Sequence, residues 1–179
     1  VGLGLVVAAS TTGAAFGAYN LERDGTSDFR ELADQRTDSQ VLLDTAPYER
    51  GGANGSVAVV LSPTEPYGPN DSRRVREFVN AGGTLVVADD FGPHSNALLD
   101  DLGASARFNG TQLRDERHYY RAPSLPVATS VNETRYTDGI GQLTLNKGTA
   151  IDAGNATVVA ATSPFAYLDR NGTGNLSAG

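Results

Sequence analysis

The sequence of 179 residues contains no Cys, Met or Trp. Without cysteine there are no disulfides, zinc–thiolate sites, iron–sulfur clusters or haem thiolates. A cysteine nucleophile is excluded for the same reason. Proteins whose function depends on a thiol, a disulfide or a thiolate ligand are therefore ruled out before any motif is considered.

Lysine is almost absent as well. Lys147 is the single lysine beside 13 arginines, and 21 acidic residues bring the net charge to −7. Without a basic excess, general binding to nucleic-acid backbones is not expected. An acidic, lysine-poor composition predicts a halophilic archaeal protein, since salt at about 1 M shortens the Debye length to about 3 Å and screens the repulsion. The alternative is an ordinary acidic mesophilic protein.

No run of apolar and small residues reaches the roughly 20 residues of a membrane-spanning helix. Residues 1–18 come closest, with no charge and many small side chains. We interpret them as the distal part of an N-terminal membrane anchor, and the alternative is a buried strand over residues 1–8 that opens a parallel sheet. Residues 19–179 are expected to form a single extracytoplasmic α/β domain, truncated at its C-terminus.

Asn-X-Ser/Thr sequons occur at seven positions, mostly beside turn-forming residues. In an extracytoplasmic protein they are glycosylation acceptors on exposed loops, although Asn-Gly-Ser/Thr is also ordinary turn chemistry. The candidate sites are Asn54, Asn70, Asn109, Asn132, Asn155, Asn171 and Asn175. Together with the apolar N-terminus, they favour a location at the cell membrane with the domain outside the cell.

The periodicity predicts an α/β fold, a three-layer sandwich with a mostly parallel central sheet. Helices are expected over residues 28–36, 70–81 and 95–102, and strands over 40–43, 56–61 and 84–88. Glycines at 82 and 83 end the second helix. After Gly103, strand-like runs at 108–113, 127–129, 142–145 and 157–162 are expected to extend this sheet and add antiparallel edge strands.

In open α/β sheets, ligands bind beyond the carboxyl ends of the strands. This rule selects four candidate ligand-binding residues that follow two predicted strands: Ser62, Thr64, Asp90 and Asn96. Asp89, Asp90 and His94 are weak catalytic candidates, as acid and base or as divalent-metal ligands. The alternative is capping of the following helix with a solvated histidine. His118, after Asp115 and Glu116, is a similarly ambiguous cluster.

A calcium-loop pattern stands near the C-terminus. Oxygen-bearing side chains fall on alternate residues from Asp169, and Gly174 occupies the position of the bend. The candidate ligands are Asp169, Asn171, Thr173 and Asn175. An ordinary Asx/Gly turn is the alternative, and glycosylation of Asn171 would compete with metal binding. Apart from calcium, no cofactor is expected.

Five segments together suggest a family. They read Tyr-Asn at 19–20, DGTSDFREL at 24–32, VAVVLSP at 57–63, FVNAGGTLVVADDFG at 78–92 and PFAYLDRN at 164–171. The sequence from about residue 19 to 179 resembles the haloarchaeal members of domain-of-unknown-function family 4350. The stretch at 81–92 is the most specific part.

The resemblance implies a class I glutamine-amidotransferase-like, flavodoxin-like fold outside the cell, with a membrane helix at each end. A continuation past Gly179 follows from it, as do neighbouring membrane proteins and a MoxR-type ATPase system as partners. True amidotransferases carry a nucleophilic cysteine where this chain has Asp89 and Asp90, so covalent thioester chemistry is excluded.

Three functions remain open: a non-catalytic ligand- or protein-binding module, a hydrolase or transferase at Asp89, Asp90 and His94, and a glycosylated structural module of the cell envelope.

Overall fold

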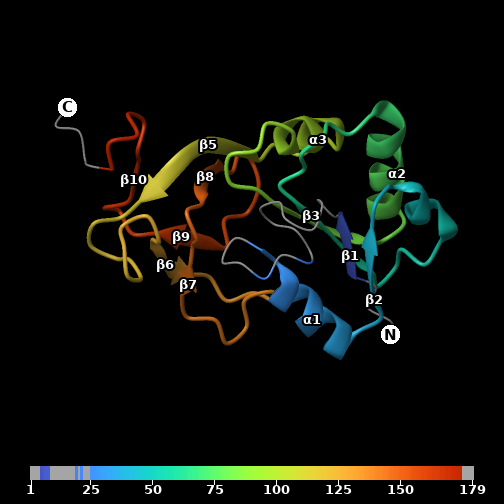
Figure 1. The fold of residues 1–179 in the computed structure, drawn as a ribbon, viewed down its shortest axis with the longest axis horizontal. Helices are drawn as coiled ribbons and strands as arrows, with labels where there is room; N and C mark the ends of the chain where they lie inside the picture. Colours follow the sequence, from blue (N-terminus) through green and yellow to red (C-terminus); the bar gives the residue numbers. More distant parts are fainter. Residues whose placement is uncertain (1–4, 9–18, 20, 22–24, 175–179) are drawn as a thin grey trace. The chain divides into compact units, whose positions relative to one another are not determined.

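The computed structural model describes residues 5–8, 19, 21 and 25–174 (Figure 1). The chain divides into two compact units, Val1–Gly103 and Ala104–Gly179. The division falls at Gly103, the point at which the sequence pattern changes from alternating strands and helices to successive strands. Each unit is described by itself below.

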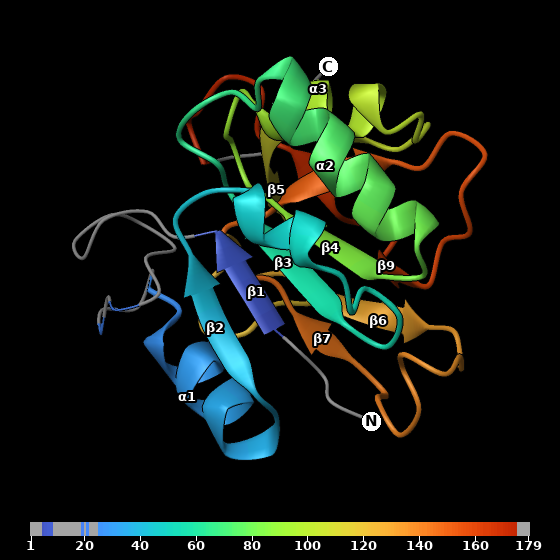
Figure 2. The ribbon, with the colours of Figure 1, turned by 90° about the vertical axis from the view of Figure 1, so that its right-hand side faces the viewer.

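Unit 1 holds a four-stranded parallel sheet in the order β2-β1-β3-β4 (Figure 2). Its strands and helices are β1 (Leu5–Ala8), α1 (Ser27–Arg36), β2 (Ser39–Leu42), a 3₁₀ helix η1 (Ala46–Arg50), β3 (Val57–Leu61), α2 (Pro69–Asn80), β4 (Thr84–Ala88) and α3 (Ser95–Asp101). The predicted strands and helices are confirmed here, with boundaries shifted by one or two residues. The 3₁₀ helix was not anticipated.

The N-terminal apolar segment contributes β1, which pairs in parallel with both β2 and β3. This matches the strand that was considered as the alternative to a membrane anchor. Residues 9–18 lie outside the described residues, and the anchor stays a prediction. No helix among the described residues is long and apolar enough to cross a membrane.

Strand β3 is buried on both faces, as its continuous apolar run predicts. On one face, Val59 packs with Ala33 of α1. On the other, Val60 packs with Val75 of α2 and Leu98 of α3, all three with no solvent exposure. Helices therefore cover both faces of the sheet at β3. Burial of each such aliphatic side chain contributes about 1.5–3 kcal/mol.

Strand β4 is covered on one face only, although its apolar run TLVVA resembles that of β3. Leu85 and Val87 pack toward α2 and α3, whereas Val86 is 43% exposed. The strand lies at the edge of the sheet, so fewer elements cover it than cover β3. In α1, Phe29 and Leu32 are exposed while Ala33 is buried, and Val79 of α2 is exposed as well.

Unit 2 contains two three-stranded antiparallel sheets with the orders β10-β5-β8 and β7-β6-β9. Its strands are β5 (Arg107–Arg114), β6 (Val127–Val131), β7 (Leu143–Thr144), β8 (Thr149–Asp152), β9 (Ala160–Thr162) and β10 (Tyr167–Leu168). The expectation that these strands extend the parallel sheet as edge strands is wrong. Among the described residues they pair with one another, always antiparallel, and three of the four pairings join strands that are not consecutive in the chain.

Helix α2 is followed by two glycines, Gly82 and Gly83, whose backbone geometry allows close packing against the core. Gly82 has φ +94°, its N–H donates to the carbonyl of Val79, and the N–H of Gly83 donates to the carbonyl of Phe78. This pair of bonds is the Schellman motif that the glycine pair predicted. It leaves Gly83 directly against the buried ring of Phe78. A Cβ atom at Gly83 would lie 2.4 Å from two ring carbons.

We expect Gly83→Ala to lower the free energy of unfolding by about 1–3 kcal/mol, because the Phe78 ring must move from its packed position. Chemical denaturation measures the change. Gly141→Ala is the matched control, since no atom lies within 4 Å of its added Cβ. Equal stability of the two variants would contradict this packing.

Candidate functional site

A cavity lies beyond the carboxyl ends of β2 and β3. Its volume is about 300 Å³, which is the lower end of the range for small-molecule pockets. The walls come from three places: the segment after β2, the loop after β3 and the first turn of α2. The lining residues are Leu42, Leu43, Asp44, Thr45, Tyr48, Leu61, Ser62, Pro63, Thr64, Glu65, Pro66, Tyr67 and Asp71.

Parallel strands place their carboxyl ends at one edge of a sheet, and this brings the two segments together. Ser62 and Thr64, two of the four predicted ligand-binding residues, line the cavity. Asp90 and Asn96, the other two, are not among its described lining residues. Both follow β4, which is separated from β2 by β1 and β3.

Sequence reasoning missed most of the polar lining, namely Asp44, Thr45, Glu65, Tyr67 and Asp71. One signal was available, because Asp44 and Thr45 directly follow a strand just as Ser62 does. No sequence pattern of this kind indicated that Asp71, in the first turn of α2, would line the cavity. It depends on the packing of η1 and α2 against each other.

Asp71 is the centre of a hydrogen-bond network in the cavity wall. The hydroxyl of Thr45 donates to Asp71 Oδ1, and the N–H of Gly68 donates to Asp71 Oδ2 at 3.2 Å. Arg74 Nη1 lies 3.6 Å from Asp71 Oδ1, and its Nε donates to Glu49 at 2.8 Å. This network ties the segment after β2 to the start of α2.

Two tyrosines complete the wall. Burial raises the pKa of Tyr67 to about 12, and the negative charge of Asp71 adds to the effect. Burial likewise raises the pKa of Tyr48 well above its usual range, with Tyr67 as the second cause. Both phenols therefore keep their protons at neutral pH and can donate hydrogen bonds. The Tyr48 ring packs edge-on against Phe78, at 5.1 Å between centroids.

The three weak catalytic candidates are engaged in the turn after β4. Asp89 Oδ1 accepts hydrogen bonds from Ser62 Oγ at 2.9 Å, from the N–H of Asp90 at 2.8 Å and from the N–H of Gly92 at 3.0 Å. Asp90 Oδ1 accepts from the N–H of Phe91. His94 is the N-cap residue of α3, where its side chain forms no cap bond.

These contacts give Asp89 a structural task. It fastens the loop after β4 to the loop after β3, and it holds Ser62 where the backbone has φ +35°. Among the described residues, no three acidic or histidine side chains gather where they would hold a metal ion.

The cluster at His118 is also a turn. Asp115 has no solvent exposure, and its carboxylate accepts from Ser163 Oγ and from the N–H groups of Arg117 and His118. His118 Nδ1 lies 3.8 Å from Asp115 Oδ2. A hydrolytic triad needs the histidine between serine and aspartate, whereas here the serine bonds directly to the aspartate.

The predicted calcium loop is described as far as Gly174, and Asn175 lies outside the described residues. Asp169 is 8% exposed, and its Oδ2 accepts the N–H of Gly174 at 2.9 Å. Asn171 Oδ1 accepts from the N–H and the hydroxyl of Thr173. These bonds form an Asx turn in the loop, and calcium binding stays a prediction.

The family described as a domain of unknown function (DUF4350) matches residues 18–179. The chain belongs to the DUF4350 family. The match covers β2, β3 and β4 of unit 1 and both antiparallel sheets of unit 2, whereas β1 precedes it. No curated protein matches this chain.

We expect Asp89→Ala to lower the free energy of unfolding by about 1–3 kcal/mol, because it leaves three donors without their acceptor. Asp90→Ala and His94→Ala should change it by less than about half as much, since their side chains make fewer contacts. Denaturation of the three variants measures the difference. If Asp90→Ala or His94→Ala proved as destabilising as Asp89→Ala, the structural assignment of Asp89 would be wrong.

Proposed function

We propose that this DUF4350 chain is a non-catalytic binding module that takes a small ligand in the cavity beyond β2 and β3. The observation that carries the proposal is the cavity itself, with its two partly buried tyrosines and its three carboxylates. A pre-formed pocket in which polar groups converge beside apolar and aromatic side chains is a usual form of a small-molecule site.

The strand order supports this location. The order β2-β1-β3-β4 corresponds to the first four strands of the flavodoxin-like arrangement 2-1-3-4-5, in which ligands bind near the switch between the first and third strands. We propose that unit 1 is a shortened flavodoxin-like, amidotransferase-like domain. Its helices on both faces of β3 agree with three layers.

A binding role is favoured over a hydrolase or transferase because of how Asp89, Asp90 and His94 are used. The two aspartates accept hydrogen bonds from the turn that they form, and none of the three residues is among the described lining of the cavity. A catalytic acid or base has to reach its substrate.

The binding experiment uses NMR spectra of the chain with a mixture of small amines, alcohols and carboxylic acids as probes. At least one probe should shift the signals of cavity residues. Thr64→Trp, which places an indole at the cavity wall, should abolish these shifts without loss of stability. Gln35→Trp adds the same indole at an exposed site on α1 and should leave them unchanged. Shifts absent from the native chain, or unchanged in Thr64→Trp, would refute the proposal.

We further propose that the domain is tethered to the membrane of a halophilic archaeon, faces outward and carries glycans. The support is the acidic composition and the exposure of all six described sequon asparagines: Asn54, Asn70, Asn109, Asn132, Asn155 and Asn171. Neighbouring membrane proteins and a MoxR-type ATPase system are the partners that we propose from the resemblance.

Glycosylation would increase the intact mass of the protein purified from its own cells. The expected result is a mass above that of the polypeptide, which falls to the polypeptide value after chemical deglycosylation. An unmodified mass would remove the sequons as support for an outward-facing location.

A further inference from the structure

We propose that the cavity beyond β2 and β3 recognises the ammonium group of a small amine. This inference rests on the proposed binding function and specifies the chemical class of the ligand. It follows from the charge, the hydrogen-bonding capacity and the aromatic content of the lining.

The charge of the lining has one sign. Asp44, Glu65 and Asp71 contribute carboxylates, and no Arg or Lys is among the described lining residues. Unit 1 as a whole has 15 acidic and seven basic residues, a net charge of −8, whereas unit 2 has six acidic and seven basic residues, a net charge of +1. A cleft lined by one sign of charge attracts ligands of the opposite sign and repels phosphates and carboxylates.

Hydrogen-bonding capacity points the same way. Carboxylates only accept hydrogen bonds, and each has about four lone-pair positions. The N–H of Ala46 donates to one Asp44 oxygen at 2.8 Å. At Asp71, the Thr45 hydroxyl donates to Oδ1 and the N–H of Gly68 donates to Oδ2. Acceptor capacity therefore remains on these carboxylates. An ammonium group supplies three N–H donors, whereas an anionic ligand would bring further acceptors.

Arg74 is a cation that lies close to Asp71, and its guanidinium already makes hydrogen bonds to other side chains. Its Nε donates to Glu49, and its Nη1 donates to Thr45 Oγ1 at 3.3 Å and lies 3.6 Å from Asp71. These bonds hold the guanidinium behind the wall. It offsets part of the charge of Asp71 and leaves Asp44 and Glu65 to act on a ligand.

The two tyrosines add a second kind of attraction. The faces of phenol rings attract cations, by about 0.5–1 kcal/mol at exposed sites and more where water is excluded. Tyr48 and Tyr67 both line the cavity and are largely buried. The contact of Tyr48 with Phe78 fixes its ring in one orientation. Aromatic rings beside carboxylates form a site for a cation with an apolar body.

The test compares three molecules of the same chain length: 1,4-diaminobutane, 1,4-butanediol and succinate, titrated into the full chain and followed by NMR and calorimetry. The diamine should bind with shifts at cavity residues, and its affinity should fall as salt is raised. The diol should bind about tenfold more weakly or not at all. Succinate should not bind.

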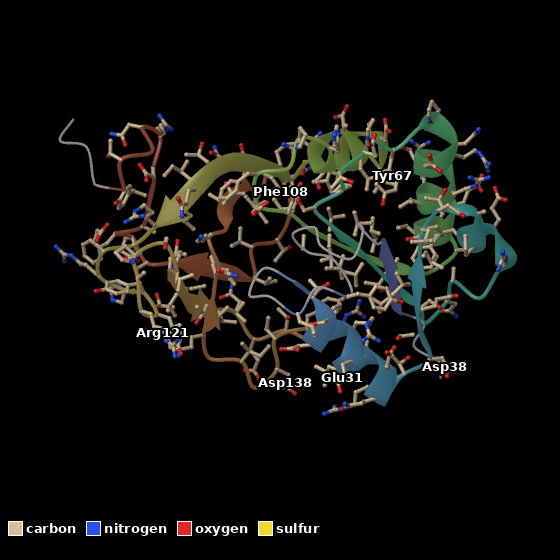
Figure 3. The ribbon with its side chains drawn as sticks, in the orientation of Figure 1. Glu31, Asp38, Tyr67, Phe108, Arg121 and Asp138 are labelled. Atoms are coloured by element: carbon tan, nitrogen blue, oxygen red, sulfur yellow. The ribbon has the colours of Figure 1, made fainter. Side chains whose placement is uncertain are left out.

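Single variants locate the interaction. Glu65→Gln, Asp44→Asn and Tyr67→Leu should each weaken diamine binding by about threefold to tenfold. Asp38→Asn is the matched control, because it removes the same charge from unit 1 just before β2, at the opposite end of that strand from the cavity. Figure 3 labels Tyr67 and Asp38 far apart within unit 1. This variant should bind the diamine as the native chain does.

The outcomes separate the two proposals. Tighter binding of the diol or succinate than of the diamine, at cavity residues, would overturn the ligand class and leave the binding function standing. Equal weakening by Asp38→Asn and Glu65→Gln would reduce the effect to general charge attraction and overturn the specific site. Absence of every cavity shift, from these molecules and from the wider probe mixture, would refute the binding function as well.

Discussion

The burial of β3 on both faces is the constraint on which unit 1 depends. Alternate residues of this strand pack against α1 on one side and against α2 and α3 on the other, so a shift of register would bring flanking Ser56 or Ser62 into the buried rows. Its fixed end determines where Ser62 emerges and where Asp89 can reach it. The loop from Ser62 to Tyr67, which forms much of the cavity wall, is held at the same point. The proposed site is thus a consequence of how the core is packed.

The polar residues of unit 1 divide into those that hold the fold together and those that remain available to a ligand. Asp89 accepts hydrogen bonds from two loops at Oδ1, while its buried Oδ2 has no hydrogen-bond partner among the described residues. Asp44 and Glu65 stand at the cavity with fewer contacts. In unit 2, buried Asp115 has the same structural task as Asp89, since it gathers donors from one turn and from Ser163. Chemical type alone does not distinguish the two groups, because the same carboxylate serves as a turn acceptor or as a ligand contact.

Local patterns predicted the local structure well. The apolar run of β3, the glycine pair after α2 and the alternation of strands and helices up to Gly103 all depend on interactions between near neighbours. The partners of the later strands were predicted incorrectly, because pairing depends on which distant segments meet. The exposed face of β4 was missed for a related reason, since burial depends on the strand's place at the edge of the sheet.

The sequence by itself determined three properties of this DUF4350 protein. It excludes cysteine chemistry, it makes the protein acidic, and it sets the positions of the main helices and parallel strands. It also placed Ser62 and Thr64 at a carboxyl edge, because that inference needs only a strand boundary. The tertiary structure decided that Tyr48, Tyr67 and Asp71 join them, and that Asp90 and Asn96 do not. Segments far apart in the chain form one cavity only after the sheet order and the packing of α2 are set, and neither is encoded in the spacing of any single motif.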